Sequence, residues 1–245
     1  MIIGYDIRRF CEDNLEKSSF NRLSEDKITK EPLVENMSTA YDYESYVLNK
    51  LFKENPLKVV DAIFIKNNDI YLFEFKRGFE QIINIGNFDI NYWKCPNKEI
   101  SRKDGTDEPI LCKDGAKYFL DNQKLKINEL KLSLHGKLVE THTVLNRFIV
   151  PKCHHSETEY KIWFVAVVDN LVMPLEETQD ILELMAGSQP TNKVADLRSS
   201  FTKYKRNGED TLPLYYDEIE IWSVAEFEEK IKKLHNWKQI KGEIA

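Results

Sequence analysis

Two adjacent apolar runs in the first third of the chain constrain its fold more than any other feature. Residues 59–65 and 70–76 are rich in β-branched and aromatic side chains, which favour strands. The short segment between them contains Asn67 and Asn68, and asparagine tolerates the left-handed backbone conformation that tight hairpin turns require. The sequence therefore predicts that the two runs pair as a β-hairpin.

Charged residues interrupt both of these apolar runs. Asp61 lies in the first run, and Glu74 and Lys76 lie in the second. Burial of a charge without a partner is strongly unfavourable, so such positions need an explanation. Strand alternation places Glu74 and Lys76 on one face together with Leu72, and the hairpin brings Asp61 close to them. The sequence thus predicts one cluster of two carboxylates and a lysine.

The spacing Glu-x-Lys is not specific by itself. The sequence contains it five times, but only Glu74/Lys76 falls inside an otherwise apolar strand. The others lie in a polar N-terminal segment, on predicted helices or at the polar entrance to a strand: Glu25/Lys27, Glu129/Lys131, Glu228/Lys230 and Glu159/Lys161. Two interpretations of the cluster remain open. Lys76 forms an ion pair with Glu74 or Asp61, or a metal ion lies between the two carboxylates, which otherwise repel each other.

Further helices and strands are expected on both sides of the hairpin. Tyr43 and Tyr46 belong to a helix predicted over 39–52, with Ser38 as its N-cap and Pro56 beyond its end. The later elements are an irregular insertion over 77–120, an amphipathic helix over 122–148, a strand covered on both faces over 162–168, an acidic helix over 175–185, an alternating strand over 218–222 and a closing helix over 225–237.

This order of elements predicts an α/β fold, with a mixed sheet faced by helices. The helix over 122–148 is expected to pack on the sheet through Leu130, Leu134, Leu138 and Leu145. Residues 1–37 are polar and lack a sustained period, so they are expected to form an irregular or partly helical extension. The remaining residues, 38–245, are expected to form the main domain.

The arrangement of Asp61, Glu74 and Lys76 resembles the PD-(D/E)XK nuclease superfamily, which carries an acid on the first strand of a hairpin and Glu-x-Lys on the second. Val60-Asp61 stands in place of Pro-Asp, and Glu74-Phe75-Lys76 matches Glu-x-Lys. A helix before the hairpin, and a helix followed by a strand after it, are also similar to the superfamily core. The resemblance covers about residues 38–170. It implies a restriction-endonuclease-like fold with an irregular insertion after the hairpin.

The resemblance also implies roles for the clustered residues. Asp61, Glu74 and the carbonyl of Phe75 would hold Mg²⁺ or Mn²⁺, which prefer oxygen ligands. Lys76 would hold the attacking water and help to neutralise the transition state. Glu44, on the preceding helix, is similar to an additional acid that many members place there; a solvated helical glutamate is the alternative. The implied activity is Mg²⁺-dependent hydrolysis of DNA, as an endodeoxyribonuclease.

The same resemblance also leads to expectations about partners and to competing functions. DNA is the expected partner, RNA stays open, no membrane partner is expected, and a homodimer is possible because restriction-type relatives commonly dimerise. One alternative is a catalytically inactive nuclease-fold protein that binds nucleic acid or serves as an assembly module. A third is a small-molecule-binding or protein-binding α/β domain whose strand charges form an ion pair.

Two stretches of the chain are locally basic, 113–137 and 193–206. The second interleaves aromatic side chains with cations, a pattern typical of single-strand binders. An ordinary solvated surface is the alternative for each stretch. The candidate nucleic-acid-binding residues in the second are Arg198, Lys203, Tyr204, Lys205 and Arg206.

Composition limits the remaining classes. The chain is 42% hydrophobic and 31% charged with a net charge of −6, which argues against a surface that binds nucleic acid everywhere. No signal peptide or long apolar stretch is found, so we expect a soluble, cytoplasmic protein. The four scattered cysteines predict reduced thiols; the alternative is a zinc site formed by Cys95, Cys112, Cys153 and His154 or His155.

Overall fold

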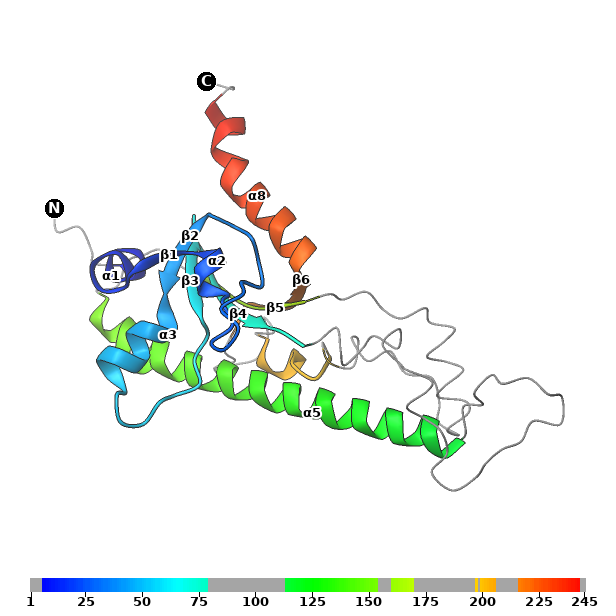
Figure 1. Cartoon of the computed structure of the whole chain (residues 1–245). Coiled ribbons are helices and arrows are strands. Elements are labelled where there is room, and N and C mark those ends of the chain that lie inside the picture. The colour runs from blue at the N-terminus through cyan, green and yellow to red at the C-terminus, as the bar shows by residue number, and fades with distance from the viewer. Residues whose placement is uncertain are drawn as a thin grey trace, which may run out of the picture.

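A computed structural model describes residues 6–78, 113–153, 160–169, 197, 199–205 and 216–242 (Figure 1). Within them, six strands form one mixed sheet in the order β1-β2-β3-β4-β5-β6. The pairs β1–β2, β2–β3 and β3–β4 are antiparallel, whereas β5 is parallel to both β4 and β6. The strands are β1 Lys17–Ser19, β2 Thr39–Asp42, β3 Ala62–Lys66, β4 Asp69–Lys76, β5 Lys161–Val168 and β6 Glu218–Ser223.

Helices flank this sheet. They are α1 Ile7–Asn14, α2 Phe20–Leu23, α3 Tyr43–Tyr46, α5 Lys113–Val144 and α8 Val224–Gly242. A π-helical turn, Val47–Leu51, continues α3, and another, Leu145–Ile149, continues α5. Short 3-10 turns occur at Val150–Lys152 and Thr202–Tyr204. The expected α/β class and mixed sheet are therefore confirmed.

The two faces of the sheet bury separate apolar clusters. On one face, Leu72 of β4 packs with Leu134 and Leu138 of α5, together with residues of α1 and α3. On the other face, Phe73 packs with Phe227 of α8 and with residues of α2. Figure 1 shows α5 running along one side of the sheet while α8 leaves from the other. Alternation along β4 thus assigns each side chain to one of two helical layers.

The predicted hairpin is confirmed as β3–β4, with Lys66 paired to Asp69 across a two-residue turn. Asn67 adopts a positive φ of 52°, as expected for an asparagine in a tight turn. One boundary differs from the prediction. Asp61 precedes β3 at a bend instead of interrupting the strand, because its flanking segment leaves the sheet toward α3 and α5.

The helix predicted over 39–52 is wrong at its start. Residues 39–42 form β2, in which Tyr41 pairs with Ile63, and the helix begins only at Tyr43. Asp42, not Ser38, is the N-cap, since its side chain accepts a hydrogen bond from Ser45 N. Pairing with the hairpin overrides the local helical pattern here.

The N-terminal segment is more ordered than the irregular extension that its polar sequence predicts. β1 pairs with β2, so residues 17–19 extend the sheet. Phe20 is fully buried and packs edge-on against Phe73 and Phe227, with ring centroids 5.4 and 5.1 Å apart. A single aromatic residue in a polar context thus reaches the centre of one core.

The later elements agree with the sequence in most respects. The strands over 162–168 and 218–222 and the closing helix are confirmed, with β6 at an edge of the described sheet. The long helix is also confirmed, but it begins at Lys113, so residues 113–120 are helical and not part of an irregular insertion. The rest of the insertion and the acidic helix over 175–185 lie outside the described residues.

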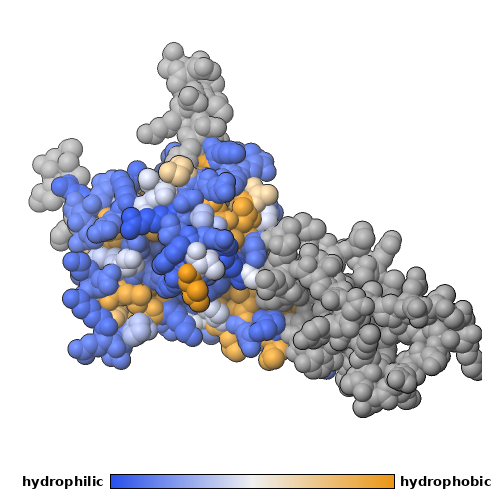
Figure 2. Space-filling view, viewed as in Figure 1, coloured by the Kyte–Doolittle hydropathy of each residue, from blue (hydrophilic) through white to orange (hydrophobic). Residues whose placement is uncertain are grey.

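The described surface is mostly polar. Figure 2 shows hydrophilic side chains over most of one face, with hydrophobic ones in separate small groups. In the described part of the chain, no helix has both the length and the apolar character needed to cross a membrane.

We predict that α5 is held by its leucine face. Leu134 is 1% exposed and Leu132, on the opposite side of the same helix, is 72% exposed. Leu134→Ala should lower the free energy of unfolding by about 2–5 kcal/mol, because it leaves a cavity. Leu132→Ala should change it by less than about 0.5 kcal/mol. Urea unfolding followed by circular dichroism measures both, and equal effects would contradict this packing.

Candidate functional site

Asp61 is fixed by its backbone as well as by its side chain. Its N–H donates to Phe73 O at 3.0 Å, and its carbonyl accepts from Tyr43 N and Glu44 N at 3.1 and 3.4 Å. Its Oδ2 accepts from Phe75 N at 2.7 Å. In a strand, the N–H and C=O of one residue point to the same side, so the carbonyl of Phe75 points toward the same edge of β4 as the N–H that binds Asp61.

Glu74 and Lys76 lie on one face of β4, as alternation predicts. The Glu74 side chain is 1% exposed, and Lys76 Nζ lies 2.9 Å from its Oε1. The ion pair that the sequence offers as an alternative to a metal site is therefore present. Lys76 itself is 26% exposed, so its ammonium borders solvent.

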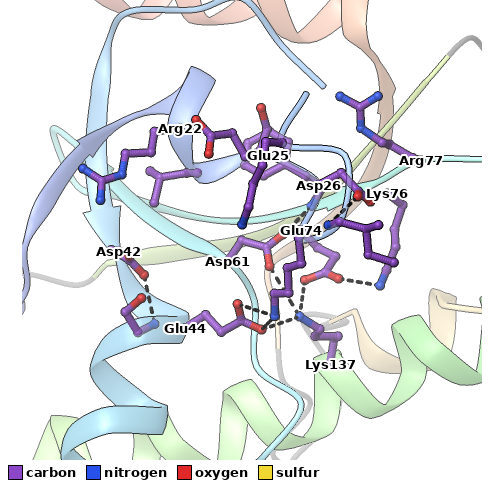
Figure 3. A pocket seen from close by; sticks show the side chains of 17 residues that line it. Arg22, Glu25, Asp26, Asp42, Glu44, Asp61, Glu74, Lys76, Arg77 and Lys137 are labelled. Carbon is purple, nitrogen blue, oxygen red and sulfur yellow. Dashed lines mark hydrogen bonds and ion pairs between the residues drawn. The ribbon is translucent and has the colours of Figure 1, made fainter. Parts of the chain in front are cut away.

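A second lysine, which the sequence analysis missed, lies among the acids (Figure 3). Lys137 Nζ is 2.9 Å from Glu74 Oε2, 3.5 Å from Asp61 Oδ1 and 3.8 Å from Glu44 Oε1. Its side chain is only 11% exposed. The available signal was helical spacing: Lys137 follows Leu134 by three residues, so it falls on the core face of α5.

The electrostatics of the cluster are only partly compensated. The pKa of Asp61 is raised to about 8, mainly by burial and also by the charges of Glu74 and Glu44, although Lys137 and the Phe75 amide act to lower it. Burial alone would lower the pKa of Lys137, but Asp61, Glu74 and Glu44 together raise it. Lys137 is therefore charged at neutral pH, while the charges of Asp61 and Glu74 still repel each other.

One oxygen of this cluster has no hydrogen bond. Glu74 Oε2 is buried and makes no well-directed hydrogen bond, and the nearest cation to it is Lys137 Nζ, at an ion-pair distance of 2.9 Å. Such an atom, next to the carboxylate of Asp61 and the carbonyl of Phe75, fits the oxygen ligands that Mg²⁺ and Mn²⁺ prefer. Within the described ranges, no group of three or more histidine, cysteine, aspartate and glutamate side chains is arranged to hold a metal ion.

Glu44 lies at the rim of the cluster and its side chain is 24% exposed. Besides Lys137, it pairs with Lys27, whose Nζ is 3.1 Å away. Lys27 belongs to the polar segment between α2 and β2, where Glu25/Lys27 gave no reason to expect a contact with the hairpin. Glu44 therefore shares the ammonium of Lys137 with Asp61 and Glu74, and its role as an additional acid stays a prediction.

The cluster opens into a cavity of about 600 Å³. Asp61, Glu74, Lys76 and Lys137 contribute to its wall, together with residues 22–28 before β2. Further basic side chains in the wall are those of Arg22, Lys27, Lys30 and Arg77. Glu25, Asp26 and Asp42 also line it, so the wall of the cavity carries charges of both signs.

The candidate nucleic-acid-binding residues lie elsewhere. Of those described, Lys203, Tyr204 and Lys205 do not line this cavity. Tyr204 is 7% exposed, packs 5.1 Å from the ring of His135 on α5 and shares a hydrogen bond with it. Lys205 pairs with Glu218 at 2.5 Å. In this conformation the tyrosine ring is occupied by packing, and the role of these residues stays a prediction; Arg198 and Arg206 lie outside the described residues.

The cysteines add little to this picture. Cys11 and Cys153 are free thiols, and burial raises the pKa of both. The other members of the zinc alternative, Cys95, Cys112, His154 and His155, lie outside the described residues. That alternative therefore stays untested.

Comparison with known proteins does not place the chain in a family. No family model, no curated protein and no solved structure matches it. The architecture that can be stated is an α/β fold with a mixed sheet flanked by helices.

A buried threonine anchors the segment that leads to Asp61. Thr141 of α5 is fully buried, and its Oγ1 accepts a hydrogen bond from Val60 N at 3.0 Å. Thr143 on the same helix donates to Val139 O, a carbonyl of its own helix, and contacts no other described segment through a hydrogen bond. Thr143 therefore serves as the matched control for a substitution at Thr141.

We predict that Thr141→Val lowers the free energy of unfolding by about 1–3 kcal/mol, because it leaves the N–H of Val60 buried without an acceptor. Thr143→Val should have little effect. Both values come from urea unfolding. An unchanged stability of Thr141→Val would show that this hydrogen bond does not anchor the segment.

Proposed function

We propose that this protein is a metal-dependent nuclease of restriction-endonuclease-like fold that hydrolyses DNA phosphodiester bonds. The observation that carries the proposal is the convergence of Asp61, Glu74 and Lys76 on one cavity, where the buried Oε2 of Glu74 contacts Lys137 as an ion pair but makes no well-directed hydrogen bond. The order α3, β3, β4, α5, β5 supports it, because the resemblance implies a helix, a hairpin, a helix and then a strand.

Asp61, Glu74 and the carbonyl of Phe75 are the groups that would hold a Mg²⁺ or Mn²⁺ ion. When bound there, such an ion would lower the pKa of a water and neutralise charge on the phosphate. Lys76 borders the cavity, so its ammonium is able to orient the attacking water and stabilise negative charge on phosphate oxygens. Attack forms a new P–O bond and breaks the bond to the leaving oxygen, which takes up a proton.

The basic side chains of the cavity wall suit a phosphate backbone. Arg22, Lys30 and Arg77 border the same space as the carboxylates. Because the whole chain has a net charge of −6, attraction to a polyanion must be local. These side chains would supply the salt-dependent part of the affinity.

A nuclease-fold binding or assembly module without catalysis is the second candidate. It is favoured by the ion pairs already present, since Lys76, Lys137 and Lys27 each pair with a carboxylate of the cluster. Under this alternative the cavity binds nucleic acid but no bond is cut. The experiment below separates the two.

We predict that the purified chain cleaves DNA in Mg²⁺ or Mn²⁺ and not in EDTA. Asp61→Asn, Glu74→Gln and Lys76→Ala should each lower the cleavage rate at least about 100-fold, because each removes charge stabilisation at the reacting phosphate. Single-stranded and double-stranded DNA and RNA, with a fluorescent label, provide the measurement.

Glu129→Gln is the matched control. Glu129 has the same Glu-x-Lys spacing, but its side chain is 56% exposed on α5, so its loss should leave the rate unchanged. Cleavage that survives EDTA, or persists in Asp61→Asn, contradicts the proposed site. Binding of nucleic acid without any cleavage supports the second candidate.

A further inference from the structure

Lys137 has the position of a bound cation. Its ammonium contacts one oxygen from each of three carboxylates, those of Asp61, Glu74 and Glu44, at 3.5, 2.9 and 3.8 Å. Two of these groups are the same acids to which the proposed function assigns the metal. Lys76, by contrast, pairs with the other oxygen of Glu74 and with no other carboxylate in the described part of the chain.

We propose that Lys137 is an internal counter-ion that competes with a divalent metal for the carboxylates of Asp61 and Glu74, so that metal binding requires its ammonium to move away. This inference rests on the proposed function only in its choice of metal ligands. An ammonium and a divalent cation repel each other. The oxygens of Asp61 and Glu74 therefore cannot bind a metal ion while the ammonium of Lys137 stays in contact with them.

The fold permits such a movement. Leu134 and Leu138 fix the backbone of α5 against the sheet, so the helix itself need not shift. A lysine has a flexible four-carbon stem and a compact charge, so its ammonium can be relocated by side-chain rotation alone. Because Lys137 lines the cavity, rotation can carry its charge from the carboxylates toward a phosphate in that space.

The movement lets Lys137 pair in turn with two kinds of group, the acids of the cluster and the substrate. In one arrangement it holds Asp61 and Glu74 together despite their repulsion. In the other, the metal takes over these acids and Lys137 becomes free to pair with substrate. Metal and nucleic-acid binding are then coupled through one side chain, since each favours the same rotated conformer.

The test measures metal affinity in the absence of nucleic acid. Mn²⁺ is titrated into the full chain and into Lys137→Met and Lys137→Arg by calorimetry. If the conformer with Lys137 turned away is a minor state of roughly 10% or less, Lys137→Met should bind Mn²⁺ at least about tenfold more tightly than the wild type. Lys137→Arg keeps the charge and should not bind more tightly.

Two further variants separate displacement from general electrostatics. Lys76→Met removes a charge that also lies 2.9 Å from Glu74, but from a lysine that need not move, so its gain in affinity should be smaller. Lys126→Met removes a charge from the exposed side of α5, where the side chain is 61% exposed, and should not change the affinity.

The variant Lys137→Met leaves buried acids unpaired, so it could be too unstable to titrate in EDTA-treated form. In that case the rise in Tm with Mn²⁺ is compared, and it should be larger for Lys137→Met than for the wild type. Equal or weaker Mn²⁺ binding by Lys137→Met, with wild-type binding intact, overturns the inference and leaves the nuclease proposal standing. Tighter binding without DNA cleavage by the wild type supports the inference and contradicts the nuclease.

Discussion

The organisation of this site depends on two carboxylates held side by side on a sheet face that is otherwise apolar. Asp61 and Glu74 both lie within 3.5 Å of Lys137 Nζ, and Glu74 is 1% exposed. The charge of Glu74 opposes ionisation of Asp61, and burial removes the water that would screen the two groups. Three groups stabilise the negative charge: the ammonium of Lys76 from β4, the ammonium of Lys137 from α5 and the backbone amide of Phe75.

Helix α5 links the stability of the core to the geometry of the site. Leu134 and Leu138 bury its face against the sheet, Thr141 binds Val60 N beside Asp61, and Lys137 reaches the carboxylates. These four residues share one helical face because three-residue and four-residue steps return to the same side. Any shift of the helix that loosens the core would therefore also separate the charges of the site.

The ion-pair and metal interpretations of the cluster need not exclude each other. The raised pKa of Asp61 indicates that the lysines compensate the buried acids incompletely. If Lys137 competes with a divalent ion, as we propose, the two interpretations describe two states of one site. Buried ion pairs contribute little net stability compared with apolar packing, so a cluster of this composition is more suited to binding than to holding the fold together.

Much of the fold was determined by the sequence alone. Periodicity over a few residues predicted the hairpin, the shared face of Glu74 and Lys76, the buried strand β5 and the leucine face of α5, because each depends only on neighbouring side chains. The tertiary structure alone decided that residues 39–42 become a strand and that Lys137 and Thr141 meet the segment around Asp61. Lys137 is 76 residues away from Asp61, and Thr141 is 81 residues away from Val60. No local pattern encodes such partners, since they meet only when α5 docks on the sheet.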